Sequence, residues 1–151
     1  MLTIRRILVP VDFTETAERA FQYAVELARK FDASVTVLHA YQIPAYGFPD
    51  AAIIASAELA TQMANAGQAR LDSLIDSNKT SGISMTAILR DGVPWEEIKA
   101  VAEEVHADLI VIGTHGRRGL ARALLGSVAE NVIRTSNLPV LVIHGPRDSD
   151  K

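Results

Sequence analysis

Apolar and polar residues follow two different periods along the chain, one typical of strands and the other of helices. Short apolar runs rich in β-branched residues predict five strands, at residues 4–11, 34–41, 83–90, 108–112 and 138–143. Between them, apolar residues recur three or four positions apart, which predicts four amphipathic helices. Strict alternation of strand and helix predicts a doubly wound α/β domain, with a parallel sheet and helices on both faces.

Each predicted helix has an apolar face that we expect to be buried. Thr14 is the expected N-cap of the first helix, and Pro94 falls in the first turn of the third, where proline is tolerated. The expected buried residues are, helix by helix, Ala17, Ala20, Phe21, Ala24, Ala28 and Phe31; Ala60, Met63, Ala64, Gly67, Leu71, Leu74 and Ile75; Ile98, Val101, Ala102 and Val105; and Ala129, Val132, Ile133 and Ser136.

Composition is that of one ordinary domain, since the chain has 151 residues, 48% of them hydrophobic and 22% charged. No repeat, low-complexity tract or linker divides it, so we predict a single domain over residues 1–145 and a polar tail over 146–151. The net charge of −3 disfavours a general nucleic-acid or membrane-surface binder. An anion site would therefore have to be built locally.

Several other classes are disfavoured by what the sequence contains. It has no cysteine, which excludes disulfides, iron–sulfur clusters and thiolate zinc sites. The histidines are scattered without metal-site spacing, so no metal site is predicted. The first apolar run is too short for a signal peptide and no run is long enough to cross a membrane, so we expect a cytoplasmic protein.

The residues suited to binding a ligand follow the first and the fourth predicted strands. In open parallel sheets, ligands bind beyond the carboxyl ends of the strands, at the point where strand order reverses. The stretch from Gly113 to Ser127 follows the fourth strand and is rich in glycine and arginine. Glycines let backbone N–H groups approach an anion, and Ser127 would begin a helix whose free N–H groups favour phosphate. These features predict a phosphate site, with Arg117, Arg118 and Arg122 as cations.

Simpler interpretations remain open. Ser127 and Glu130 fit a capping box that needs no ligand, Gly113 could merely end a strand, and Asp12 could cap the first helix. The sequence has neither G-x-x-x-x-G-K-[ST] nor a G-x-G-x-x-G after its first strand. A P-loop ATPase and an ordinary NAD dehydrogenase are therefore disfavoured.

The chain resembles the universal stress protein (UspA-like) family, in particular its ATP-binding subgroup. Members that bind ATP carry G-x2-G-x9-G-[ST], and Gly113, Gly116, Gly126 and Ser127 match that spacing. The opening RRILVPVDF, the closing GSVAENVIRTSNLPVLVI and the Gly92-Val93-Pro94 segment also look like the family. The resemblance implies strand order 3-2-1-4-5, in a fold of the adenine nucleotide alpha hydrolase-like type.

The resemblance also implies a nucleotide site made by several loops. Asp12 and the backbone of Pro10 and Val11 would read the adenine and approach the ribose, with Ala40 lining the base pocket. The ribose and phosphates would meet the residues that follow the fourth strand and those that begin the last helix, namely Gly113, Thr114, His115, Gly116, Arg117, Gly126, Ser127 and Val128.

We accordingly expect a regulatory stress-response protein that binds ATP, ADP or AMP, with Mg²⁺ reaching the site only through the phosphates. No catalytic residues are predicted, and the protein is expected to sense nucleotide and act on a regulatory protein partner. The alternatives are a weak ATPase or phosphotransferase and a structural dimer module that binds no nucleotide. The last strand would be a bare apolar edge, so we expect a homodimer through Leu138, Val140, Leu141, Val142 and Ile143.

Overall fold

The computed structural model describes residues 1–43, 50–114 and 125–146, and of residues 50–56 the backbone alone. Strands and helices alternate along the described chain, as the sequence pattern predicts. The elements are, in chain order, β1 (Arg6–Pro10), α1 (Glu15–Phe31), β2 (Ser34–Tyr41), α2 (Asp50–Ser77), a short 3-10 helix (Lys79–Ser81), β3 (Met85–Asp91), α3 (Pro94–Glu104), β4 (Leu109–Gly113), α4 (Ser127–Thr135) and β5 (Val140–Ile143).

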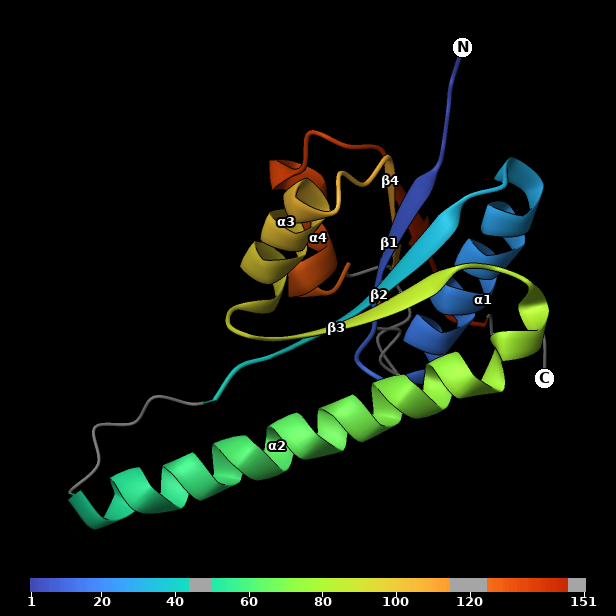
Figure 1. Ribbon diagram of the computed structural model, residues 1–151. Coiled ribbons are helices and arrows are strands. Elements are labelled where there is room, and N and C mark those ends of the chain that lie inside the picture. Colours follow the sequence, from blue (N-terminus) through green and yellow to red (C-terminus); the bar gives the residue numbers. More distant parts are fainter. Residues whose placement is uncertain (44–49, 115–124, 147–151) are drawn as a thin grey trace.

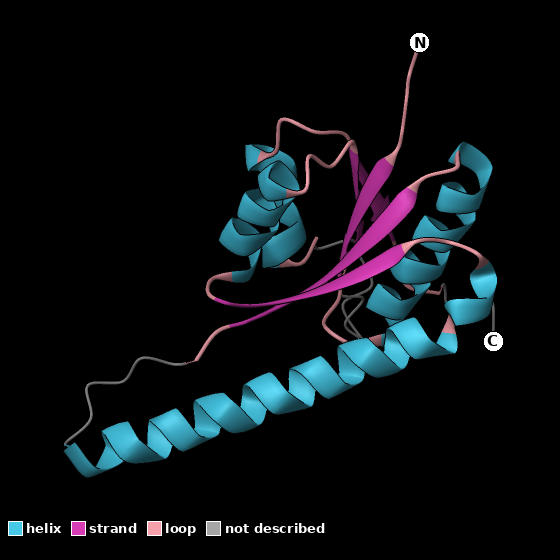
Figure 2. Ribbon diagram, viewed as in Figure 1, coloured by secondary structure: helices cyan, strands magenta, loops and turns pink. Residues whose placement is uncertain are grey.

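The five strands form one sheet in the order β3-β2-β1-β4-β5, and every neighbouring pair is parallel. Figure 2 shows the strands twisting together between the helices. The predicted doubly wound fold with order 3-2-1-4-5 is therefore confirmed. Chain order reverses between β1 and β4, which places the loops after these two strands side by side at the carboxyl edge of the sheet.

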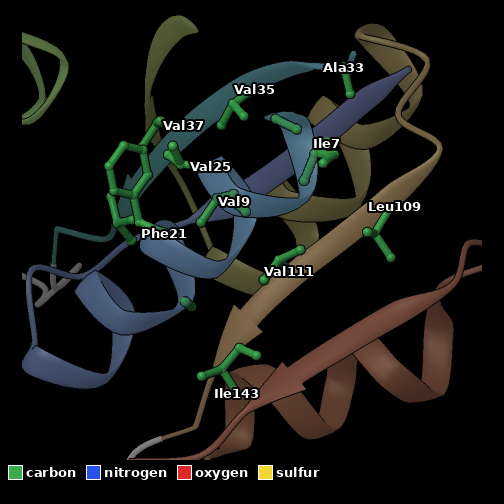
Figure 3. Packing of buried hydrophobic residues seen from close by; sticks show 14 of the residues in the cluster. Ile7, Val9, Phe21, Val25, Ala33, Val35, Val37, Leu109, Val111 and Ile143 are labelled. Atoms are coloured by element: carbon green, nitrogen blue, oxygen red, sulfur yellow. The ribbon is translucent and has the colours of Figure 1, made fainter. Parts of the chain in front are cut away.

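Helices cover both faces of the sheet, α1 and α2 one face and α3 and α4 the other (Figure 1). Each face has its own hydrophobic core. Phe21 of α1 is fully buried in the first, against Val9, Val35 and Val37 of the central strands (Figure 3). Ile98 of α3 is buried in the second core. Because the central strands are covered on both faces, they read as nearly continuous apolar runs.

Most expected buried faces are confirmed, and two residues are corrections. Phe31 remains 44% exposed because it is the last residue of α1, just before Asp32 turns the chain away in the left-handed conformation (φ 54°). Ile133 of α4 remains 44% exposed although its neighbour Val132 is buried. The predicted strand ends also shift by up to two residues, as expected where hydrogen bonding rather than side-chain pattern sets the boundary.

The long helix α2 packs on the sheet through its C-terminal half and extends beyond it at its other end (Figure 1). Leu71 of α2 is fully buried between this helix and the sheet, in the core that α2 shares with α1. The helix comes close to the sheet at Gly67, since a Cβ there would lie 3.0 Å from Leu89 Cδ1 and 3.2 Å from His39 Cδ2. The apolar stripe predicted for this helix is thus the side that meets β2 and β3.

Candidate functional site

A cavity of about 230 Å³ opens at the carboxyl edge of the sheet, where β1 and β4 lie side by side. Residues from the ends of β1, β2 and β4 and from the first turns of three helices line it. They are Pro10, Val11, Asp12, Thr14, Ala17, Ala40, Pro94, Ile98, Ile112, Gly113, Thr114, Gly126, Val128 and Ala129. This is the position at which doubly wound sheets bind ligands.

The β1–α1 connection is held by a short chain of hydrogen bonds. Asp12 Oδ1 accepts from the Thr14 backbone N–H at 3.1 Å and from the Thr14 hydroxyl at 2.5 Å. Thr14 Oγ1 in turn accepts from the Ala17 N–H at 3.3 Å, which makes Thr14 the N-cap of α1 as predicted. Asp12 therefore supports the cap without being the cap, and its side chain remains at the cavity wall.

Between Asp12 and Thr14, Phe13 turns the chain in the left-handed conformation, with φ at 62°. This conformation costs a non-glycine residue roughly 1–2 kcal/mol. Contacts on the α2 side of the sheet offset that cost, because the ring of Phe13 lies 4.6 Å from that of His39 and 4.5 Å from Arg70 Cζ. The turn sends Phe13 toward α2 while its neighbour Asp12 reaches the cavity.

The backbone of Val11 is already engaged within the protein. Its N–H donates to Leu38 O at 2.8 Å, and its carbonyl lies 2.7 Å from His39 Nδ1, which donates to it. His39 and Ala40 are consecutive on β2, so their side chains point to opposite faces of the sheet. His39 thus fixes the strand end from the α2 side, while Ala40 lines the cavity on the other side.

Gly113 is required by packing. A Cβ on this residue would lie 2.8 Å from the backbone oxygen of Thr16 in α1, closer than real Cβ atoms approach. Gly113 pairs with Ile143 at the end of β4, and the next residue, Thr114, donates its N–H to Ile143 O at 3.0 Å. Gly113 is therefore the last residue of a strand, which agrees with the simpler interpretation of the sequence. It also lies at the cavity wall.

Besides α1, whose N-terminus is capped by Thr14, the N-termini of α3 and α4 reach the cavity, and their chemistry differs. α3 begins with Pro94, which has no N–H, and carries Glu96 and Glu97 in its first turn. α4 begins after Gly126, which has no side chain to cap it, and the one acidic residue of its first turn, Glu130, accepts from Arg134 at 2.6 Å. A phosphate is favoured by free N–H groups and disfavoured by carboxylates, so the α4 end suits an anion.

The capping box, left open by the sequence as a simpler interpretation of Ser127 and Glu130, is not formed. Gly126 occupies the N-cap position, Ser127 is the first residue of α4, and no side chain among the described residues caps the helix. Glu130 lies on the exposed side with Arg134, one turn further along the helix. The N–H groups of the first turn of α4 therefore have no side-chain acceptor from the N-cap.

The opposite part of the cavity wall is apolar. Pro10, Ala40, Pro94 and Ile98 contribute only carbon-bearing surface from their side chains. The sequence pattern predicts Pro94 at the start of a helix and Ile98 on its buried face, and it gives no sign that either residue lines a site. Their place in the cavity follows from the strand order, because α3 crosses from β3 back over the sheet toward β4.

The structure brings eight of the predicted nucleotide-binding residues to this one cavity, from four separate segments of the chain. Ser127 is exposed at the start of α4, between two residues that line the cavity. His115, Gly116 and Arg117 lie outside the described residues, as do Arg118 and Arg122. Sequence reasoning missed the lining residues Thr14, Ala17, Pro94, Ile98, Ile112 and Ala129.

Two searches of the described residues were negative. No group of three or more His, Asp or Glu side chains is arranged there to hold a metal ion. Within the same part of the chain, no helix combines the length and the apolar character needed to cross a bilayer.

The sheet is doubly wound and has a cavity where the strand order reverses. These features place the chain in the class of α/β proteins whose ligand sites lie at the carboxyl ends of the strands. Within that class, the model of the universal stress protein family matches residues 3–144. The chain therefore belongs to the universal stress protein family, as its sequence motifs suggest.

Relatives agree with this assignment over nearly the whole chain. The universal stress protein MJ0531 of Methanocaldococcus jannaschii is 36% identical over 145 residues, which are 95% of this chain and 84% of that protein. The solved structure of MJ0577 from the same organism has a TM-score of 0.80 at 31% identity, covering 97% of this chain and 99% of that one.

Two similar structures were solved with nucleotides. One is a universal stress protein in complex with cAMP, with a TM-score of 0.65 at 29% identity over 94% of this chain and 98% of that one. The other is the universal stress protein of Archaeoglobus fulgidus in complex with dAMP, with a TM-score of 0.62 at 27% identity over 95% and 99%.

Proposed function

We propose that this protein binds an adenine nucleotide in the cavity between β1 and β4 and acts as a nucleotide-responsive regulatory protein. The observation that carries the proposal is the cavity itself, which combines an apolar wall with a helix N-terminus whose N-cap residue, Gly126, has no side chain. A nucleotide has the same two parts, a flat base and an anionic phosphate. The complexes of two relatives with cAMP and dAMP support the same ligand class.

The charges of the two helices suggest how the nucleotide lies. The base belongs among Ala40, Pro94 and Ile98, beside the helix whose first turn carries two glutamates. The phosphate belongs at Gly126 and Val128, where the N–H groups of α4 begin. The ribose then lies between them, next to the carboxylate of Asp12, which would accept hydrogen bonds from its hydroxyls.

The size of the cavity favours the base and sugar over the whole nucleotide. Its volume of about 230 Å³ is below the roughly 300–1,000 Å³ of most small-molecule sites. A second or third phosphate would therefore extend past the start of α4. ATP, ADP and AMP all fit such a site, and Mg²⁺ would come with the phosphates.

The regulatory role includes a homodimer through β5. This strand is at the edge of the sheet, and Leu141 presents an apolar side chain that is 36% exposed. Pairing with β5 of a second copy would satisfy the unpaired backbone groups of both edges. Ligand binding would then be communicated through a symmetric assembly to a regulatory protein partner.

The proposal is tested by calorimetric titration of the protein with ATP, ADP and AMP, in the wild type and in Ala40→Ile. The larger side chain projects into the cavity, so nucleotide affinity is expected to fall at least about tenfold. Isoleucine suits a half-buried strand position, so the thermal unfolding temperature should change little.

Ala69→Ile is the matched control, because Ala69 is exposed on α2, on the other side of the sheet. It adds the same atoms and should leave affinity unchanged. Nucleotide binding that is equally strong in Ala40→Ile would exclude this cavity as the site. A wild-type protein that releases no heat with any of the three nucleotides at millimolar concentration would refute the function.

A further inference from the structure

One histidine outside the predicted site contacts it from the neighbouring strand. His144 follows β5 and is exposed, and its Nδ1 lies 3.3 Å from the hydroxyl of Thr114. Thr114 follows β4, is only 5% exposed and lines the cavity. The two residues are 30 positions apart in sequence and meet because β4 and β5 are parallel neighbours.

We propose that His144 is a positioning residue that orients the Thr114 hydroxyl toward the phosphate of the bound nucleotide. The inference rests on the proposed function, and it adds a determinant of phosphate recognition to that site. It follows from the hydrogen-bonding capacity of the two groups. A hydroxyl has one hydrogen to donate, and the imidazole nitrogen either donates or accepts.

When Nδ1 carries no hydrogen, Thr114 donates to it and turns only lone pairs toward the cavity. A phosphate oxygen is also an acceptor, so that arrangement gives no bond. When Nδ1 carries the hydrogen, His144 donates to Thr114 Oγ1, and the hydroxyl hydrogen is released toward the phosphate. The exposed ring can meet solvent through Nε2 in either state, so the ligand selects the donating state at small cost.

The backbone of Thr114 is held beside the end of β5. Its N–H donates to Ile143 O at 3.0 Å, which keeps the Thr114 side chain within reach of His144. On the other side is α1, whose Thr16 lies next to both Gly113 and Gly145, the residue that follows His144. Gly113 and Gly145 leave room for Thr16 beside the pair, and Thr114 both lines the cavity and contacts His144.

The test compares the affinities for AMP and adenosine, which differ only in the phosphate, by calorimetry. His144→Ala should weaken AMP binding by about three- to tenfold, the effect of one hydrogen bond, and adenosine binding by less than about twofold. His144→Asn, whose amide can donate from nearly the same place, should restore most of the AMP affinity. His106→Asn is the control. It removes an exposed imidazole that lies before β4, at the amino ends of the strands and away from the cavity, and it should change neither affinity.

A double-mutant cycle separates positioning from general effects. Thr114→Val removes the hydroxyl with little change of shape, and in that background His144→Ala should cause no further loss of AMP affinity. Equal losses for AMP and adenosine, or fully additive effects in the cycle, would overturn the role of His144 while leaving nucleotide binding intact. A wild type that binds neither compound would instead refute the proposed function, and this inference with it.

Discussion

At the scale of single residues, Gly113 shows how one position serves two purposes. The sequence places it at the start of a glycine-rich loop suited to phosphate, and the structure gives it a packing role against α1. Its φ is not in the left-handed region, so backbone freedom is not what requires glycine here. The requirement is space, because the backbone of Thr16 occupies the position of the missing Cβ.

Gly113→Ala is therefore expected to lower the free energy of unfolding by about 1–3 kcal/mol, the usual effect of overpacking. Urea denaturation of the unliganded protein measures this directly. Gly145→Ala is the matched control, because among the described residues its Cβ would meet only the Thr16 hydroxyl, at 3.2 Å. Its loss should be less than half as large, and equal losses in the two variants would contradict the packing role.

Residue identity alone could not reveal the pairing of His144 with Thr114. Both residues are ordinary in sequence, and a lone histidine after a strand is usually an exposed polar residue. The pairing becomes visible only when β4 and β5 are known to be parallel neighbours, since their carboxyl ends then lie together. The strand order implied by the family resemblance places the two strand ends together, but the contact between these two side chains depends on the register of β4 and β5 and on side-chain orientation.

At the scale of elements, the N-termini of α3 and α4 support the proposed orientation of the nucleotide more directly than the glycine motif does. The apolar faces of both helices were predicted from the sequence because periodicity records burial. The capping of their N-termini is harder to predict from the sequence, since Ser127 and Glu130 match a capping box that α4 does not form. A cap depends on where the helix begins, and a one-residue shift moves the serine from the N-cap into the first turn.

The edge strand β5 gives the prediction that belongs to this scale. Val140 and Val142 pack on the core shared with α3 and α4, whereas Leu141 points to the other side and is 36% exposed. Leu141→Lys should therefore convert the proposed dimer into monomers in light scattering while the fold is retained, because a charge at an exposed edge opposes strand pairing.

Thr36→Lys serves as the control, since Thr36 is half-buried on the interior strand β2 and is away from the proposed interface. If it folds, it should remain dimeric. Persistent dimers of Leu141→Lys would reject pairing through β5. Val140→Lys and Val142→Lys are weaker tests, because a charge there would also disturb the core.

At the scale of the whole molecule, the fold was predicted more completely than the site. The alternation of strands and helices and the two covered faces follow from apolar patterning, whereas the strand order followed only from the family resemblance. The site gathers residues from five separate segments, so residues such as Pro94 and Ile98 reveal their place only once the sheet is assembled. Patterning records which residues are buried, and it does not record which buried residues face a cavity.

The cavity lies between the two covering layers, at the point where α1, α3 and α4 all approach the carboxyl edge of the sheet. A ligand there would contact every layer of the molecule and would be expected to stabilise the folded state. Binding at this position therefore links the β1 and β4 loops to the helices around them. This linkage is the physical basis of the proposed regulatory role.

The most direct test of this account is a heteronuclear NMR titration of the protein with AMP, with adenosine as the phosphate-free comparison. The account predicts that both compounds shift the amides around Ala40 and Ile98, and that AMP alone strongly shifts those of Ser127, Val128 and Ala129 at the start of α4. Shifts confined to other surfaces, or an unchanged spectrum at millimolar AMP, would contradict it.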